Sequence, residues 1–342
     1  MRVLTTGHAG YIGSVLAPLL QAAGHEVVGF DTGFYSGCDF GSGPEPILEL
    51  VGDLREVRPE QLEGFDAIVH LAALSNDPLG SIDPEVTYEI NFEASVRLAL
   101  AAKAAHVPRF LFASSCSLYG SAGDAPLDEM APLGPITPYA ETKAWFERAL
   151  RPMADDDFSP TYLRNATAHG ISPRLRGDLV VHNLVGSALT TGEVLIKSDG
   201  SPWRPLIHVE DIGRAFLAVL EAPRELVHDQ AFNVGRDDQN FQVRDIANVV
   251  AAAVPGSEVV YAPGGEPDAR DYRVDFSKIH SQLPELKIQW DLEESVEDLV
   301  AEFRRHELTL GTLDGPRHTR LRRIEQLRDS GALDERLRWV SR

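Results

Sequence analysis

The chain has 342 residues, which is more than a single hydrophobic core usually holds, so we expect two interlocked lobes or one large α/β domain with additions. A formal net charge of −20 and a pI near 4.9 argue against a broad nucleic-acid-binding face but leave room for small phosphorylated ligands. The two cysteines, Cys38 and Cys116, have no CxxC or metal-ligand spacing, which argues against a disulfide framework and against a metal site.

The N-terminal stretch MRVLTTGHAG passes from a short apolar run directly into a glycine turn. It lacks the apolar core and the cleavage site of a signal peptide. No segment has about 18 consecutive apolar residues, the length that a membrane span requires. We therefore expect a cytoplasmic protein without a membrane segment.

The first half of the chain alternates short β-like runs with helical segments, which is the pattern of a parallel sheet covered on both faces. The predicted strands are Val3–Thr6, Glu26–Phe30, Ala67–His70, Phe110–Ala113 and Pro160–Arg164. The predicted helices are Gly13–Ala23, Glu85–Ala105 and Tyr139–Leu150. This order predicts an α/β fold with a Rossmann-like, doubly wound parallel sheet.

Beyond about Asn165 the sequence becomes a series of pieces punctuated by Gly and Pro. Shorter helices are predicted at Asp211–Glu221 and Val243–Val254. We expect residues 1–165 to form the sheet domain and residues 166–301 to form a smaller lobe over the strand ends. This division allows segments after residue 165 to return to the first domain.

Residues 302–342 make a strongly charged tail. Within it, RLRRIEQLRDSGALDERLRW reads as a helix that has Leu321, Ile324 and Leu327 on one face. Such a helix serves either to cover the lobes or to bind a partner.

The stretch TTGHAGYIG places Gly7, Gly10 and Gly13 between the first strand and the first helix. Glycine at these positions permits a tight turn and lets backbone N–H groups approach a pyrophosphate. Asp31 ends the second strand eighteen residues after Gly13, where a carboxylate accepts hydrogen bonds from an adenosine ribose and repels a 2′-phosphate. The order predicts a site for NAD rather than NADP, against the alternative of a glycine-rich turn beside an ordinary aspartate. Asp53 is placed either to bind the adenine amine or to serve as a turn residue.

Further motifs follow these in order along the chain. They are GDL at Gly52–Leu54, HLAAL at His70–Leu74, Asn91, SSCSLYG at Ser114–Gly120, YAETK at Tyr139–Lys143, RPLIHVED at Arg204–Asp211 and FNVG at Phe232–Gly235. Together with the glycine turn and Asp31, they resemble the extended short-chain dehydrogenases/reductases. The closest resemblance is to the NAD-dependent nucleotide-sugar epimerase/dehydratase family, and it spans roughly residues 1–300.

The resemblance implies NAD as the cofactor and a nucleotide-diphosphate sugar as the substrate. The cofactor contacts that it implies are Gly7, Gly10, Tyr11, Ile12, Gly13, Asp31, Asp53, Leu54, Leu71, Ala72, Ala73, Asn91, Tyr139 and Lys143. It also implies a homodimer, in which the helix over Glu85–Ala105 and the Tyr139 helix form a four-helix interface.

Tyr139 and Lys143 lie one helical turn apart in PITPYAETKAWFERAL, so their side chains share a face. Thr137 and Pro138 suit the N-cap and the first helical position, which puts this face at the positive end of the helix. A nearby ammonium and a nicotinamide cation would stabilise a phenolate. By itself the pair also fits a packed tyrosine and a solvated lysine.

By resemblance, Tyr139 is the base that removes a proton from a sugar hydroxyl, and Lys143 also holds the nicotinamide ribose. Ser115 matches the family Ser or Thr that hydrogen-bonds the same hydroxyl. The related 4,6-dehydratases carry Asp and Glu directly after this position, whereas Cys116 and Ser117 stand here. The sequence therefore favours simple 4-epimerisation, with Cys116 as a small buried residue rather than a reactive thiol and Ser117 near the substrate.

Arg204 matches the family arginine that binds the substrate diphosphate, for which planar Arg is well suited. The second family arginine aligns with Gly265, so either Arg270 or Arg273 takes its place. Two more residues are expected beside the base or sugar: Thr167, which occupies the sugar-facing Asn position, and Leu179. His169, which replaces a usual Tyr, reads as a structural histidine.

An NAD-dependent nucleotide-sugar 4-epimerase is therefore the leading hypothesis. An NDP-4-keto-sugar reductase and a non-catalytic NAD-binding regulator on the same fold are the alternatives. The nucleotide and the sugar stay open.

Overall fold

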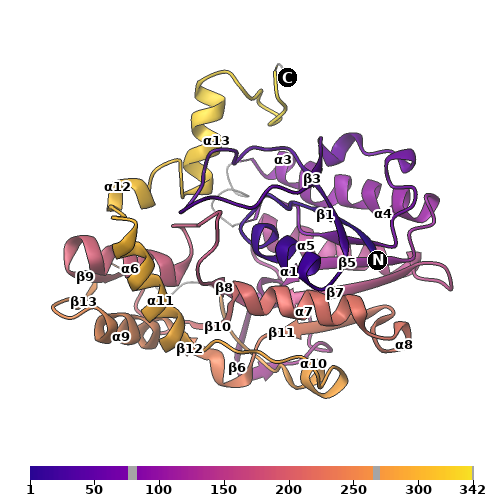
Figure 1. The fold of residues 1–342 in the computed structure, drawn as a ribbon. Helices are drawn as coiled ribbons and strands as arrows, with labels where there is room; N and C mark the ends of the chain where they lie inside the picture. The colour runs from indigo at the N-terminus through magenta and orange to yellow at the C-terminus, as the bar shows by residue number, and fades with distance from the viewer. Residues whose placement is uncertain (76–82, 265–269, 341–342) are drawn as a thin grey trace.

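The computed structural model describes residues 1–75, 83–264 and 270–340, and its centre is a seven-stranded parallel sheet (Figure 1). In spatial order the strands are β11 (Gln230–Val234), β7 (Ser159–Asn165), β5 (Arg109–Ser115), β4 (Ala67–His70), β1 (Arg2–Thr6), β2 (Glu26–Asp31) and β3 (Leu48–Val51). The five predicted strands all lie in this sheet, within two residues of their predicted ends. The α/β, doubly wound parallel sheet is confirmed.

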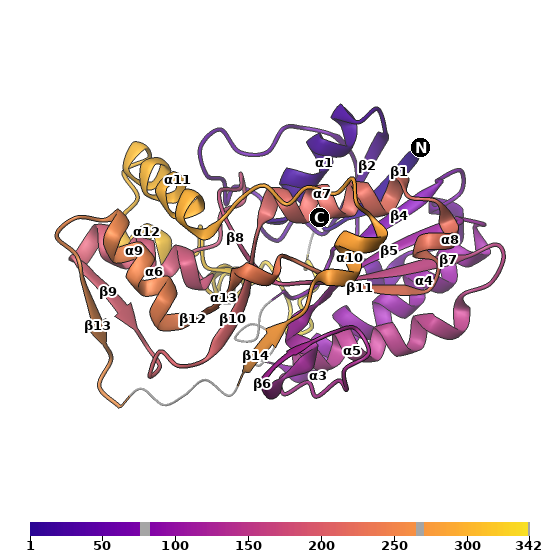
Figure 2. The same cartoon turned by 90° about the horizontal axis from the view of Figure 1, so that it is seen from below.

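Helices cover both faces of this sheet (Figure 2). On one face lie α1 (Gly13–Ala22) and α7 (Val209–Glu221), and on the other lie α4 (Ala94–Ala104) and α5 (Pro138–Leu150). Every residue of β4 and β7 is buried, because parallel strands between two helix layers have no solvent face. Leu16 and Phe216 belong to the apolar core on the first face, and Leu98 and Phe146 belong to the core on the second.

The predicted helix over residues 85–105 is not one regular α-helix. It begins as α3 (Pro84–Tyr88), where the side chain of Asp83 caps the backbone N–H of Val86. It then passes through a π-helical turn, η3 (Glu89–Glu93), before it continues as α4. Asn91 lies in this turn, where its amide exchanges hydrogen bonds with the backbone of Leu74 at 2.7 and 3.1 Å. A π turn adds one residue to the helix, and such turns often occur at functional sites.

The chain leaves the sheet after β7 and later returns to it. β11 pairs in parallel with β7, and α7 packs against α1, so residues 209–234 belong structurally to the first lobe. The second lobe contains α6 (Val180–Thr191), β9 (Glu193–Ile196), α9 (Val243–Ala253), β13 (Glu258–Tyr261) and α11 (Leu292–Arg305). Its own apolar core includes Val185, Val250 and Phe303.

Short strands connect the two lobes. A three-stranded sheet contains β8 (Thr167–His169), β10 (Trp203–His208) and β12 (Asn240–Gln242), and a separate pair consists of β6 (Ser121–Leu127) and β14 (Asp271–Val274). The remaining short helices are η1 (Leu54–Glu56), η2 (Pro59–Gln61), η4 (Cys116–Tyr119), η5 (Arg151–Met153), α8 (Arg224–Val227), η6 (Asp237–Gln239) and α10 (Ser277–Gln282). β8 follows β7 almost directly, so the second lobe is joined to the carboxyl edge of the sheet.

The charged tail contains α12 (Leu310–Leu313) and α13 (Arg320–Asp329), which lies above the sheet edge near α3 in Figure 1. The predicted helix extended further, but α13 ends at Asp329 and Gly331 follows it with a φ of 73°. Glycine adopts this left-handed conformation without strain, and it commonly ends helices. Ile324 and Leu327 are buried as the predicted face requires. Across the described ranges, the model has no helix long and apolar enough to span a membrane.

Candidate functional site

One cavity of about 990 Å³ extends from the glycine turn, past the start of α5, into the second lobe. The predicted site residues that line it are Gly7, Gly10, Tyr11, Ile12, Gly13, Asp31, Asp53, Leu54, Leu71, Ala72, Ala73, Ser115, Ser117, Tyr139, Lys143, Thr167, Leu179, Arg204 and Arg270. Asn91 does not line the cavity. It supports the wall from behind, because its amide fixes the backbone of Leu74, which does line the cavity.

In the glycine turn, backbone segments approach one another so closely that a side chain at Gly7 or Gly13 does not fit. Gly7 has a φ of 71°, and a Cβ there would lie 2.7 Å from the backbone nitrogen of Ala72. A Cβ on Gly13 would lie 2.3 Å from the carbonyl oxygen of Gly7. The turn thus brings bare backbone to the N-terminus of α1, where N–H groups and the helix dipole favour a phosphate. This cradle fits the pyrophosphate of NAD.

Asp31 is held in place at the end of β2. Its carboxylate accepts hydrogen bonds from the backbone N–H of Gly33 at 2.8 Å and of Ala9 at 3.3 Å. Both donors are neutral, so the negative charge of Asp31 stays at the cavity wall, where it suits a ribose diol and opposes a 2′-phosphate.

Asp53 plays the role of a turn residue while it lines the cavity. Its carboxylate caps η1 through the backbone N–H of Arg55 at 2.9 Å. The same carboxylate accepts hydrogen bonds from the Arg55 guanidinium, at 3.0 Å from Nε. An adenine contact therefore has to share this carboxylate with Arg55.

The start of α5 is built as the sequence predicts. The Thr137 hydroxyl caps the helix by accepting a hydrogen bond from the Ala140 N–H at 3.2 Å, and Pro138 is the first helical residue. Lys143 is only 4% exposed, and its Nζ donates to the Ala113 carbonyl at 2.7 Å. Nζ lies 5.5 Å from the centroid of the Tyr139 ring. Burial lowers the pKa of Lys143 to about 7, which the nearby Glu147 carboxylate partly opposes.

Ser115 and Ser117 lie at the end of β5 and in η4. The Ser115 Oγ accepts a hydrogen bond from the Ser117 N–H at 3.2 Å. In the described part of the chain, the buried Ser117 Oγ and Asn165 Oδ1 have no hydrogen-bond partner, yet both residues line the cavity. Buried polar atoms without partners are costly, so both atoms are suited to bind a polar ligand.

Cys116 points away from the cavity. It is 1% exposed, and its Sγ contacts the Arg164 carbonyl oxygen at 3.1 Å. Burial raises the pKa of this thiol far above its ordinary value, so the reactive thiolate is not formed.

The substrate end of the cavity contains two arginines. Arg204 is 7% exposed, and its guanidinium donates to the carbonyl oxygens of Trp203 and Arg270. Arg270 lines the cavity, whereas the Arg273 guanidinium stacks over the Trp203 ring at 4.7 Å and does not line it. The geometry favours Arg270 as the second arginine. Gly265 lies outside the described residues.

Two further predicted positions, Thr167 at the start of β8 and Leu179 at the N-cap of α6, line the same end of the cavity. His169 does not line it. Its Nδ1 lies 2.7 Å from the Ser295 hydroxyl, and burial holds its pKa well below the ordinary value, so His169 is a neutral structural residue.

Sequence reasoning missed several cavity residues: Tyr35, Asn165, Arg176, Asp178 and Arg320. Arg176 and Asp178 form a buried two-point ion pair, with both N–O distances at 2.9 Å. The pattern RLRGD pointed to charged residues in this loop but not to their pairing. No group of three or more His, Cys, Asp or Glu side chains suited to a metal occurs in the ranges that the structure covers.

Comparisons with known proteins agree with this geometry. Residues 3–235 match the model of the NAD dependent epimerase/dehydratase family. A UDP-glucose 4-epimerase of Mycolicibacterium smegmatis is 32% identical over 308 residues, which are 83% of this chain and 92% of that protein. The structure of MoeE5 in complex with UDP-glucuronic acid and NAD is similar with a TM-score of 0.77 and 28% identity, over 89% of this chain and 99% of that one.

The same fold occurs in the NAD-dependent NDP-hexosamine 5,6-dehydratase TunA, with a TM-score of 0.79 and 24% identity over 89% of this chain and 98% of that chain. Epimerases and dehydratases thus share this architecture, and the fold alone does not separate their reactions. The family match and the NAD complex of MoeE5 both agree with the glycine turn and Asp31. The chain is therefore a member of the NAD-dependent epimerase/dehydratase family, and NAD is its cofactor.

Proposed function

We propose that this chain catalyses the 4-epimerisation of a nucleotide-diphosphate sugar with tightly bound NAD. The observation that carries the proposal is the arrangement of Tyr139, Lys143 and Ser115 in the cavity that also contains the NAD cradle. A nucleotide cradle alone would suit a sensor or a regulator. The proton-transfer residues beside it support an enzyme.

In the proposed reaction, the Tyr139 phenolate accepts the proton of the sugar 4-hydroxyl. The Lys143 ammonium, held by the Ala113 carbonyl below the Tyr139 ring, stabilises that phenolate and binds the nicotinamide ribose. Ser115 hydrogen-bonds the same hydroxyl and the ketone that replaces it. When bound, NAD would supply reversible hydride transfer at C4, so the sugar would keep its oxidation state while its configuration at C4 changes.

Dehydration is the reaction from which this proposal must be separated. Loss of water from a sugar needs a further acid and base next to the serine, but Cys116 and Ser117 occupy these positions. Cys116 is buried with a raised pKa and bonds to a backbone carbonyl, so it does not substitute for a carboxylate. The site therefore favours oxidation and reduction at one carbon.

The opposite end of the cavity suggests the substrate class. Arg204 and Arg270 would bind the diphosphate, while Ser117, Asn165 and Thr167 offer hydroxyl and amide groups to the sugar. UDP-hexoses come first for testing, because a relative is named for UDP-glucose and a similar structure holds UDP-glucuronic acid.

We also propose that the protein is a homodimer that pairs through α4 and α5. Leu100 on α4 is 54% exposed and Trp145 on α5 is 37% exposed, and both helices cover the same face of the sheet. Large exposed apolar side chains on neighbouring helices are the kind of surface that a second copy would cover.

The test incubates the purified protein with UDP-, dTDP-, GDP-, CDP- and ADP-sugars and follows epimerisation by proton NMR. The expected result is NAD that copurifies with the protein, and interconversion of two epimers without added nicotinamide cofactor. A strict need for stoichiometric NADH or NADPH would contradict the proposal and favour an NDP-4-keto-sugar reductase. NAD binding without turnover of any sugar would favour a regulator.

A further inference from the structure

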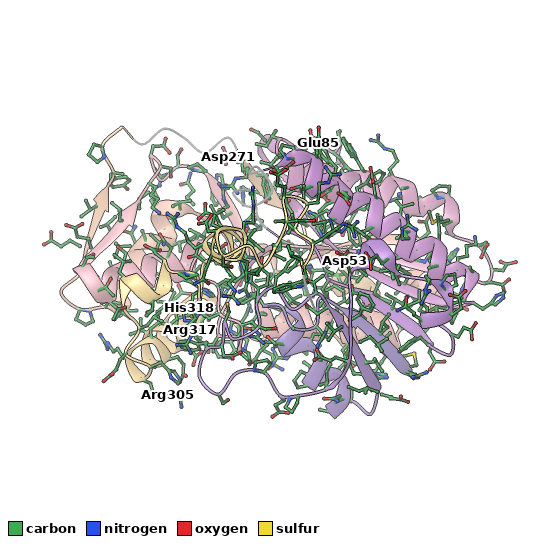
Figure 3. All side chains as sticks on the ribbon, turned by 90° about the horizontal axis from the view of Figure 1, so that it is seen from above. Asp53, Glu85, Asp271, Arg305, Arg317 and His318 are labelled. Atoms are coloured by element: carbon green, nitrogen blue, oxygen red, sulfur yellow. The ribbon has the colours of Figure 1, made fainter. Side chains whose placement is uncertain are left out.

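The C-terminal segment, residues 317–340, contributes directly to the cofactor cavity. Four consecutive residues at the start of α13, from Thr319 to Arg322, line it. Figure 3 shows this segment from above, where it crosses the middle of the molecule between His318 and Asp53. The family match ends at residue 235, so it does not include this part of the wall.

The segment is anchored on the loops that form the adenosine end of the cavity. The Trp339 Nε1 donates to the Thr32 carbonyl at 2.9 Å, and the Arg55 guanidinium donates to the Leu337 carbonyl at 3.1 Å. Ile324 and Leu327 pack in one apolar cluster with Phe34 and Leu74, which line the cavity from its inner side. These contacts fix the start of α13 against the cofactor site.

Arg320 is the unusual residue of this segment. It is 2% exposed, and its guanidinium lies 4.1 Å above the Tyr35 ring centroid. It donates a hydrogen bond to the Arg174 carbonyl at 3.0 Å, and the stabilising carboxylate, Asp178, already forms its ion pair with Arg176. Burial lowers its pKa, which reflects the cost of a buried cation. A guanidinium has five N–H donors, so Arg320 can bind an anion in the cavity that it lines.

The contacts of Arg320 place it at the cofactor end of the cavity rather than at the sugar end. Through the Arg174 carbonyl, Arg320 contacts the loop over residues 170–178, and this loop is hydrogen-bonded to the glycine turn. The Tyr11 hydroxyl donates to the Gly170 carbonyl at 2.7 Å, and the Ser172 hydroxyl donates to the Tyr11 carbonyl at 2.8 Å. The two arginines of this loop already have acidic partners, Asp39 for Arg174 and Asp178 for Arg176.

We propose that the C-terminal segment is part of the NAD site, and that Arg320 binds a phosphate oxygen of the NAD pyrophosphate. The glycine turn supplies N–H donors to one side of the pyrophosphate, and Arg320 supplies a charged donor from the other side. The anchored segment then retains the cofactor, which an enzyme that regenerates NAD within each turnover requires. Arg320 acts on NAD binding and takes no part in proton transfer.

The test compares Arg320→Gln and Arg320→Lys with Arg328→Gln, which removes an exposed arginine from the same helix. NAD retained through gel filtration is measured first. NAD is then titrated into protein stripped of cofactor, and the thermal midpoint is recorded with and without NAD. We expect Arg320→Gln to raise the Kd for NAD on the order of tenfold or more, because a charge-assisted hydrogen bond is lost. The Kd of Arg320→Lys for NAD is expected to lie between those of the parent protein and of Arg320→Gln. Arg328→Gln is expected to bind NAD like the parent protein.

Two outcomes would overturn the proposal. If Arg320→Gln lowers the thermal midpoint equally with and without NAD, while the Kd for NAD is unchanged, Arg320 is only structural. If NAD binding is unchanged but the KM for the nucleotide sugar rises, Arg320 binds the substrate diphosphate instead. The measurements of NAD binding require no turnover and are independent of which sugar reaction the protein catalyses, and only the KM comparison needs a sugar substrate.

Discussion

Replacing Tyr139 with Phe removes one hydroxyl from the cavity and leaves the ring in place. General base catalysis by a positioned side chain contributes on the order of 10²- to 10⁴-fold, so turnover should fall by that factor. NAD should still copurify, because the glycine turn and Asp31 are untouched. Both quantities are measured on one preparation, by NMR for turnover and by absorbance of released NAD. Unchanged turnover would exclude Tyr139 as the base.

The lowered pKa of buried Lys143 leads us to expect that the stability of the protein depends on pH. Its folded pKa of about 7 lies below the ordinary value of 10.5, because burial disfavours the ammonium. Between these values the unfolded state binds more protons than the folded state, so the free energy of unfolding rises with pH. The destabilisation is fully present below pH 7 and is relieved above it. Between pH 7 and 8 the gain is about 1 kcal/mol.

The measurement is urea unfolding of NAD-free protein at pH 6, 7, 8 and 9, with Lys143→Met as the matched variant. The difference in unfolding free energy between parent and variant isolates Lys143 from the other titrating groups. Lys143→Met should lack the rise above pH 7. A parallel pH profile for the two proteins would show that Lys143 stays charged in the folded protein.

At the scale of elements, a buried ion pair attaches α5 to the sheet. Arg164 in β7 contacts Glu147 in α5 through Nη2 at 2.6 Å and Nε at 3.0 Å, with both side chains at most 3% exposed. The Ser114 hydroxyl also donates to Glu147. Because α5 carries Tyr139 and Lys143, the ion pair and the Ser114 hydrogen bond hold these two residues against the ends of β7 and β5.

Arg164→Met should destabilise the protein by roughly 3–5 kcal/mol, because it leaves the Glu147 carboxylate buried without its cation. The double variant with Glu147→Leu should recover much of this loss, since two apolar side chains replace the pair. Denaturant unfolding of the parent, both single variants and the double variant measures the coupling. Additive losses would show that the two side chains do not interact.

The same elements show how far the sequence predicts the structure. Strands such as β4 are short and mostly apolar, and Thr137 and Pro138 mark the capped start of α5, so the sequence predicts both closely. The π turn at Asn91 is not predicted, and the partner of Asn91, Leu74, lies seventeen residues away in the chain. Local periodicity carries no information about such a partner.

The candidate site divides in the same way. Gly7, Asp31 and Tyr139 lie in local motifs whose spacing predicts that they line the cavity, whereas Arg320 is held at the cavity by a contact with Arg174, which is 146 residues away in the chain. A charged helix at the end of a chain looks the same whether it covers a cofactor or faces solvent. Only the folded arrangement separates these cases.

For the whole molecule, the proposed dimer gives the most direct prediction. One chain has a mass of 37.5 kDa, and the mass measured by sedimentation at micromolar concentration should be twice this value. Leu100→Arg should shift the protein to one chain mass, because an unpaired charge would be buried between two copies of α4. Leu226→Arg on α8 is the matched control, since Leu226 is similarly apolar and 41% exposed but lies outside α4 and α5. A monomeric parent protein, or a dimer insensitive to Leu100→Arg, would place any interface elsewhere.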